Sequence, residues 1–332
     1  MKRAGYLTEA IADLENLRLA FWKSKKKKSG SEDVYAFGAN LDKNLLSLSA
    51  EILSGTVSVG GYSYFKVYDP KERLICAASF RERVLHHALM NICDPVFEKF
   101  QIYDSYATRV GKGQFAALER AKGWISGGMW FCKLDMRKYF DSISHEVLYS
   151  QLRGKFKDER VLAVFKQIID SYGTAPGRGV PIGNLTSQYF ANFYLAHLDH
   201  YAKEELRIRK YVRYMDDVLM IDSSKERLLN HAAKIQEFCE QKLRLELKPV
   251  CLNSVEKGVP FLGYVLFPCG VRLNKNSKKR FLRKHKCYAG KLRSGAWSQK
   301  EYARHAEPLF AFTRYADTLN FRRYAVEKME VG

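Results

Sequence analysis

Apolar and polar residues alternate or recur along this chain in patterns that predict both strands and helices. Alternation over short segments bounded by turn residues predicts strands, and apolar residues spaced three or four apart predict helices. Strands are expected at 62–68 with a second strand after the turn at Asp69–Pro70, at 129–135, as a hairpin over 210–222, and at 243–248 and 259–267. Helices are expected at 7–23, 80–100, within 106–125 after a loop, at 144–172, 184–207 and 225–243, and from Lys275 onward.

The order of these elements favours one fold class. Strands and helices interleave without a regular strand–helix–strand rhythm, which favours an α+β fold over a doubly wound sheet. A Gly- and Pro-rich loop at 173–183 (GTAPGRGVPIG) separates two of the helices.

The net charge of the chain indicates which kind of binding partner to expect. It carries 56 Lys and Arg residues against 36 Asp and Glu, a net charge of +20 over 332 residues. So basic a protein usually has a polyanionic partner, most often nucleic acid, although a basic solvated surface would give the same count. Residues 23–32 (KSKKKKSGSE) are either a flexible basic loop that contacts phosphates or a solvated linker.

The cysteines and the N-terminal segment indicate the cellular compartment in which the protein is expected. Seven cysteines are scattered without a CxxC pair or a Cys/His cluster, which argues against a zinc site and favours reduced thiols. Acidic residues interrupt the N-terminal segment where a signal peptide needs an apolar core, and no window approaches about 18 apolar residues. We therefore expect a cytoplasmic protein without membrane association.

The sequence KYVRYMDDVLMID places Asp216 and Asp217 side by side between two apolar runs. Adjacent carboxylates repel each other and oppose burial, so the pair either forms an exposed turn or binds a divalent cation. A third acid, Asp135, ends the predicted strand at 129–135. If that strand lies beside the hairpin, Asp135 and Asp216 converge. Carboxylates near a bound phosphate substrate are the ligands that Mg²⁺ prefers, and two such ions about 3.5–4 Å apart activate a hydroxyl and stabilise a leaving pyrophosphate.

Three motifs in the same order resemble the catalytic region of reverse transcriptases: LDMRKYFDSI, YMDD about 80 residues later, and FLGY about 45 residues after that. The resemblance runs from about Tyr64 to Gly332. It implies a right-hand polymerase fold in a protein of bacterial or phage origin. The implied divisions are an N-terminal helix and basic loop (1–30), fingers (31–125), a palm (126–270) with a fingers insertion at about 150–183, and a basic helical thumb (271–332).

The resemblance also assigns roles, residue by residue. It implies that Asp135, Asp216 and Asp217 are catalytic and bind two Mg²⁺ ions, or Mn²⁺, and that Phe140 is the steric gate against a ribose 2′-hydroxyl. Without Asp135, core packing would be the simpler interpretation of Phe140. Family positions that contact the incoming nucleotide or template are matched by Arg73 and Arg109, and more weakly by Lys71, although each would also suit a plain surface charge. The primer grip corresponds to Phe261, Leu262, Gly263 and Tyr264. The family's later Lys has no secure match, because Lys248 lies near that position but is offset from it.

The segment Pro181-Ile182-Gly183 with Gln188 resembles one branch of the family. Most relatives have Gln before this Gly and Pro at the position of Gln188. The pattern here is similar to reverse transcriptases of diversity-generating retroelements, which implies a template-repeat RNA copied with errors at adenines. Ile182, Gly183 and Gln188 are therefore nucleotide-binding candidates. Ile182 has no hydrogen-bond donor, and one lost contact removes about 0.5–1.5 kcal/mol of orientation. We hypothesise that Ile182 lowers fidelity; simple packing of the loop is the alternative.

The basic C-terminal segment resembles the family's thumb. Its cations are expected to follow the backbone of an RNA/DNA heteroduplex without reading sequence. They are Lys278, Lys279, Arg283, Lys284 and Lys286. By resemblance the partners are a structured noncoding template RNA, dNTPs and a small basic helical accessory protein that forms a ring.

Three alternatives stay open. The first is a reverse transcriptase of the bacterial antiviral (anti-phage) defence type, which uses an associated noncoding RNA. The second is an RNA-dependent RNA polymerase, against which Phe140 argues. The third is a catalytically inactive RNA-binding scaffold, which would have no need of Asp135, Asp216 and Asp217.

Overall fold

The computed structural model describes residues 3–26, 30–68 and 72–330. Lys71, a candidate from the sequence, lies outside the described residues, as do the expected turn at Asp69–Pro70 and residues 27–29 of the basic segment 23–32. No helix in the described ranges is both long and apolar enough to cross a membrane.

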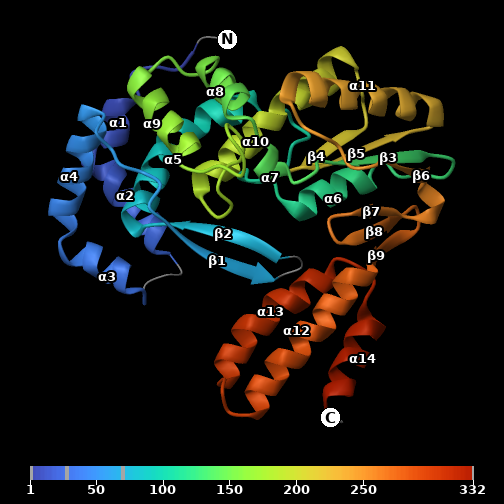
Figure 1. Cartoon of the computed structure of the whole chain (residues 1–332). Helices are drawn as coiled ribbons and strands as arrows, with labels where there is room; N and C mark the ends of the chain where they lie inside the picture. The colour runs from blue at the N-terminus through green and yellow to red at the C-terminus, as the bar shows by residue number, and fades with distance from the viewer. Residues whose placement is uncertain (1–2, 27–29, 69–71, 331–332) are drawn as a thin grey trace.

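The first part of the chain is helical (Figure 1). The helix expected at 7–23 is two helices, because Asp13 begins the second one by accepting hydrogen bonds from the amides of Glu15 and Asn16. The helices of this part are α1 Thr8–Ala12, α2 Leu14–Lys25, α3 Glu32–Ala39, α4 Leu41–Ser54 and the long α5 Phe80–Phe100. Their apolar faces form one end of the larger core, around residues such as Leu17, Leu48 and Leu85.

The predicted hairpin at 62–78 is confirmed. Strands β1 Tyr62–Tyr68 and β2 Glu72–Ala78 pair antiparallel, with Tyr62 opposite Ala78. Most of β1 is exposed, and the hairpin extends from the N-terminal helices toward the C-terminal ones (Figure 1).

A four-stranded antiparallel sheet forms the centre, in the order β4-β5-β3-β6. Its strands are β3 Trp130–Asp135, β4 Tyr211–Tyr214, β5 Asp217–Asp222 and β6 Cys251–Ser254. Cys132 and Leu134 of β3 belong to the larger core, with residues of α10 Leu185–His200 and α11 Lys225–Leu243. Phe131 belongs to a second core, with residues of α6 Gln114–Lys122. The sheet thus separates two apolar cores.

The strand expected at 243–248 is wrong. This segment contributes only an isolated bridge between Leu247 and Met136, and β6 takes the place beside β3. Arg244 has a positive φ of 52° that ends α11, so the chain turns sharply before its alternating leucines can extend as a strand.

Two further predicted helices are divided. The segment 144–172 forms α8 His145–Arg153 and α9 Glu159–Asp170, where buried Asp158 accepts bonds from the amides of Val161 and Thr8. The segment 184–207 is α10 followed by one π-helical turn, Tyr201–Glu205. A four-residue helix, α7 Tyr139–Ser142, follows β3.

The C-terminal part begins with a small antiparallel sheet and ends in three helices (Figure 1). The elements are β7 Val259–Phe261, β8 Tyr264–Phe267, β9 Gly270–Leu273, α12 Lys275–Arg293, α13 Gln299–Arg314 and α14 Leu319–Glu330. A short 3-10 turn, Val255–Lys257, joins β6 to β7.

The loop at 181–183 is fastened to the hairpin. The amide of Cys76 on β2 donates to the carbonyl of Ile182 at 2.8 Å. Gly183 has a φ of +119°, and a Cβ there would lie 2.8 Å from Cγ2 of Ile75 and 3.1 Å from the carbonyl oxygen of Cys76. Only glycine allows this close approach, which joins the hairpin to the start of α10.

Gly183→Ala should destabilise the protein by about 2–4 kcal/mol, because it adds backbone strain to a steric clash with β2. Gly177→Ala is the matched control in the same loop: its φ is +67° and a Cβ meets nothing within 4 Å, so strain alone should cost about 1 kcal/mol. Urea unfolding midpoints measure both. Equal losses in the two variants would contradict the close-approach argument.

Candidate active site

The turn between β4 and β5 presents Asp216 and Asp217 at the end of the central sheet. Met215 forms the tight part of the turn with a φ of 50°, which non-glycine residues seldom adopt, and Tyr214 pairs with Asp217 across it. The predicted hairpin is therefore present, with the two acids at its turn.

A buried arginine supports this turn from below. The Arg213 guanidinium donates to both carboxylate oxygens of Asp199, at 2.7 and 2.6 Å, and both side chains are 0% exposed. Its Nη1 donates to the Met215 carbonyl and to Oδ1 of Asn192, each at 2.9 Å. The guanidinium therefore holds the strained residue that precedes Asp216.

The structure brings the three predicted acids to one edge. Asp135 is the direct cross-strand partner of Asp217, because β3 and β5 pair antiparallel in that register. Each of these two carboxylates carries an ammonium partner: Nζ of Lys248 lies 2.7 Å from Oδ1 of Asp135, and Nζ of Lys133 lies 2.8 Å from Oδ1 of Asp217. Lys248, which sequence matching left out, is thus part of the site.

Asp216 has the least favourable environment for a negative charge. Burial, together with the charges of Asp217 and Asp135, raises the pKa of its carboxyl to about 6, although Lys248 partly offsets these effects. Such a shift in a group beside two other acids is typical of a functional site.

The donor set fits a hard divalent cation that is shared with a substrate. No three acidic, His or Cys side chains in the described ranges converge closely enough to hold a metal by themselves. Mg²⁺ in phosphoryl-transfer sites is usually held by one or two carboxylates plus substrate phosphates, with no cage made only of protein ligands. Asp135 and Asp216 supply ligands of that kind.

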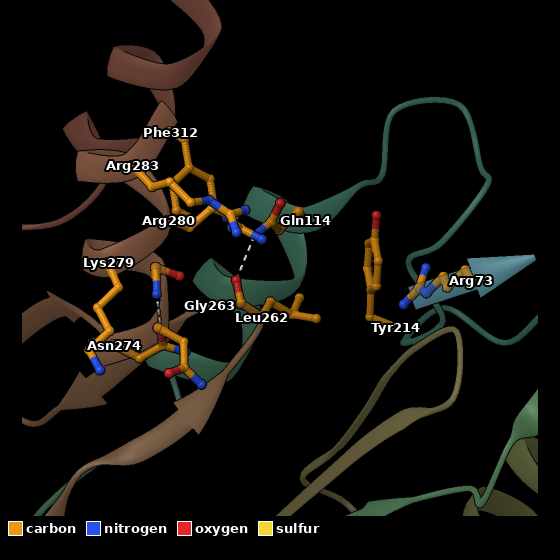
Figure 2. A pocket seen from close by; sticks show the side chains of 12 residues that line it. Arg73, Gln114, Tyr214, Leu262, Gly263, Asn274, Lys279, Arg280, Arg283 and Phe312 are labelled. Carbon is orange, nitrogen blue, oxygen red and sulfur yellow. Dashed lines mark hydrogen bonds between the residues drawn. The ribbon is translucent and has the colours of Figure 1, made fainter. Parts of the chain in front are cut away.

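A cavity of about 780 Å³ lies between the central part of the chain and the C-terminal helices (Figure 2). Figure 2 shows Tyr214 of β4 between Arg73 of the hairpin and Leu262, with Arg280 directed toward Gln114. The Arg and Lys side chains that line this cavity would attract a polyanion. The lining residues are Arg73, Gln114, Tyr214, Leu262, Gly263, Asn274, Asn276, Ser277, Lys279, Arg280, Arg283 and Phe312.

The four predicted primer-grip residues divide into two kinds. Leu262 and Gly263 form the β7–β8 turn, with φ values of 48° and 89°, and line the cavity. Gln114 of α6 donates to the Leu262 carbonyl at 2.6 Å, which fixes the turn. Phe261 and Tyr264 are buried instead, and the Tyr264 hydroxyl donates to the Phe312 carbonyl.

Of the nucleotide-binding candidates that the structure describes, only Arg73 lines the cavity. The geometry argues against Arg109, whose side chain is 8% exposed and whose donors are engaged by the Glu98 carboxylate and the carbonyls of Ile102 and Ser105. Arg109 therefore stabilises the 101–113 loop. The other four lie outside the cavity lining: Phe140 and Ile182 half-buried, Gly183 and Gln188 exposed.

The predicted cations of α12 lie on different faces of that helix. Lys279 and Arg283, one turn apart, line the cavity. Lys278 lies over the Phe321 ring of α14 instead, at 5.8 Å, and neither Lys284 nor Lys286 contributes to the lining. Arg280, which the sequence argument did not single out, lines the cavity with them. The signal in the sequence was the spacing of three residues between Arg280 and Arg283, which places both on the same face of a helix.

Comparison with known proteins adds the family. Residues 68–266, more than half of the chain, match the model described as "Reverse transcriptase (RNA-dependent DNA polymerase)". This chain belongs to the reverse transcriptase family. Its α+β architecture is that of a right-hand polymerase, as predicted.

Individual relatives are distant. The chain is similar to "Protein YkfC" of Escherichia coli (24% identity, 67% of this chain and 72% of that protein). It is also similar to "Group II intron-encoded protein LtrA" of Lactococcus lactis (22%, 58% and 35%). Matches to two Saccharomyces cerevisiae intron proteins span about a quarter or less of their length. A telomerase structure from Candida albicans aligns with a TM-score of 0.47 at 13% identity, over 75% of this chain and 55% of that one.

Asp216→Asn should raise the melting temperature measured in EDTA at pH 7.5, because it removes a carboxylate that folding makes harder to ionise. The folded pKa of about 6 lies above the ordinary value of 3.8. Folding stability therefore falls as the pH rises from about 4 through 6, and the penalty is fully present above that range. The advantage of the variant should shrink as the pH is lowered from 6 to 4, as thermal unfolding at each pH would measure.

Asp222→Asn is the matched control from the other end of β5. Burial alone would raise the pKa of Asp222, but hydrogen bonds from Arg227 and the Ser224 amide outweigh it and hold the pKa below its usual value. Such a group contributes stability above its unfolded pKa and loses it as the pH falls through the folded one. Asp222→Asn should therefore lower the melting temperature at pH 7.5. Shifts of the same sign in both variants would refute the assigned environments.

Proposed function

We propose that this reverse transcriptase family member is an RNA-directed DNA polymerase that makes cDNA from a structured noncoding RNA. The observation that carries the proposal is the edge of the central sheet, where Asp135 faces Asp217 across β3 and β5 with Asp216 beside them. Family membership and the basic cavity next to Tyr214 support it. The description of the matched family as an RNA-dependent DNA polymerase supports an RNA template.

The proposed reaction is nucleotidyl transfer at the carboxylates. Asp135 and Asp216 would hold the metal, with Asp217 adjacent, and two Mg²⁺ or Mn²⁺ ions, when bound, would activate the 3′-hydroxyl and stabilise the leaving pyrophosphate. Asp216 has to lose its proton to serve as a ligand, and its raised pKa of about 6 still leaves it ionised at neutral pH. Arg213 fixes the turn on which this carboxylate is carried.

The remaining roles follow the divisions proposed for the chain. Arg73, in the fingers (31–125), would contact the triphosphate, because its side chain is exposed on β2 and borders the cavity. The Leu262–Gly263 turn of the palm (126–270) would hold the primer end. In the thumb (271–332), Lys279, Arg280 and Arg283 would contact the heteroduplex backbone, while residues 1–30 precede the fingers. Phe140 is proposed as the gate that favours dNTPs.

We further propose the retroelement type, with a template-repeat RNA, errors at template adenines and a small basic helical accessory ring. Its support is the segment at 181–188, in which Ile182 precedes Gly183 and lies half-buried against β2. The antiviral defence type, using its own noncoding RNA, is the alternative that the product of the reaction would reveal.

Primer extension tests the polymerase proposal. The purified protein with its native flanking RNA, a primer, Mg²⁺ and dNTPs should make cDNA, and Asp216→Ala should lower the rate by at least about 100-fold, because its carboxylate is a proposed metal ligand. Sequencing of the product should show errors opposite template adenines. Accurate or repetitive, untemplated cDNA would favour the defence type, and incorporation of rNTPs would favour an RNA polymerase. Equal results for the wild type and Asp216→Ala would leave only a scaffold.

Ile182→Gln should lower misincorporation opposite template adenine by about three- to tenfold, because the new amide can hydrogen-bond near the nucleotide and restore about 0.5–1.5 kcal/mol of orientation. Ile182→Leu keeps an apolar side chain and should leave the error spectrum unchanged. Sequenced single-round products measure both. An unchanged spectrum in Ile182→Gln would show that Ile182 only packs the loop.

A further inference from the structure

Lys133 lies on β3 two residues before Asp135, so both side chains project from the same face of the sheet. Its Nζ is 2.8 Å from Oδ1 of Asp217, on the neighbouring strand. The Lys133 side chain is 22% exposed and that of Asp217 is 28% exposed, so the pair is partly shielded from water and screened less than a surface pair. Leu219 on β5 and Cys251 on β6 are its cross-strand neighbours, so sheet pairing fixes its position.

The three carboxylates of the site are therefore not equivalent. Asp217 is bound by Lys133 and Asp135 by Lys248, whereas Asp216 has no ion-pair partner in the described part of the chain. The two ammonium groups leave the site with one uncompensated negative charge. Lys248 comes from a segment that follows α11, whereas Lys133 belongs to the catalytic strand itself, so the sheet fixes its backbone beside Asp217.

A divalent cation near Asp217 meets the ammonium of Lys133 on the same carboxylate. Like charges at such a distance repel, and a partly shielded site weakens that repulsion less than bulk water would. A nucleotide changes this balance, because its triphosphate supplies negative charge and oxygen ligands. Without the nucleotide, the positive charge of Lys133 weakens metal binding. When the nucleotide is bound, its phosphate oxygens give the metal ligands that lie away from Asp217.

We propose that Lys133 is a positioning residue: a fixed counter-ion that retains Asp217 and keeps the affinity of the site for divalent metal low until the nucleotide binds. The inference rests on the proposed function, because it assumes that this site takes metal with a nucleotide. It assigns metal binding chiefly to Asp135 and Asp216. Asp217 instead has the role of neutralising Lys133 at the edge of the sheet.

Mn²⁺ binding to the full chain without nucleotide, followed by the EPR signal of unbound Mn²⁺, tests the proposal without any measurement of polymerisation. Lys133→Met keeps an unbranched side chain, one atom shorter, and removes its charge, so the affinity for Mn²⁺ should rise about three- to tenfold. Lys133→Arg keeps the charge and should bind Mn²⁺ as the wild type does. The melting temperature of Lys133→Met in EDTA should fall, and added Mn²⁺ should restore it.

Lys225→Met is the control for net charge. Lys225 begins α11 and its Nζ lies 5.3 Å from the centre of the Trp130 ring, at the opposite end of the same strand. This variant loses the same charge and should leave Mn²⁺ affinity unchanged. An equal rise in Lys225→Met would overturn the proposal in favour of a general charge effect.

The carboxylates provide the second test. Asp217→Asn should weaken Mn²⁺ binding less than Asp135→Asn or Asp216→Asn does. Unchanged or weaker binding in Lys133→Met, or an equal loss for all three Asn variants, would overturn the proposal. Polymerisation is measured separately: a chain that binds Mn²⁺ as expected but makes no DNA would contradict the proposed function and leave the role of Lys133 supported.

Discussion

The buried ion pair between Arg213 and Asp199 is the interaction on which the rest of the site depends. Both side chains are fully buried, and the guanidinium also bonds Asn192 and Ser105 and the carbonyl of Met215. It therefore joins α10, the 101–113 loop and the β4–β5 turn. Loss of one partner would leave an uncompensated buried charge, which typically costs about 3–5 kcal/mol. The cost of burying this pair is offset by its role: it holds the strained turn at Met215 and thereby fixes the position of the Asp216 carboxylate.

Above this pair, the site holds negative charges closer together than stability alone would favour. The sheet register places Asp135 opposite Asp217, and Asp216 is partly desolvated beside them. Two lysines relieve part of the repulsion and leave Asp216 uncompensated. The residual instability is what a cation and a phosphate substrate would relieve, and functional sites commonly carry such strain.

The cavity that Tyr214 of β4 borders is assembled from the hairpin, the central sheet, the small sheet and the C-terminal helices. Two single contacts fix its geometry: Gln114 holds the Leu262 carbonyl, and Tyr264 holds the Phe312 carbonyl. Gly183 provides the close contact that ties the α10 loop to the hairpin. Arg73 and the α12 cations Lys279, Arg280 and Arg283 thus line one cavity, although Arg73 is far from α12 in the chain. The position of α12 relative to the small sheet decides which cations of this helix reach the cavity.

The sequence by itself determined the hairpin at 62–78, helices α5 and α11, the strand that ends at Asp135 and the turn with Asp216 and Asp217, because each depends on local patterning of apolar residues and turn formers. The tertiary structure alone decided which charges meet. Lys248 reaches Asp135 across 113 positions, Lys133 meets Asp217 through strand register, and Arg109 is held by Glu98 away from the cavity. The hydrophobic periodicity also did not predict that the expected helices at 7–23 and 144–172 would each be divided, at Asp13 and near Asp158. Side-chain pairing depends on register and on the packing of distant elements, and neither leaves a local pattern in the sequence.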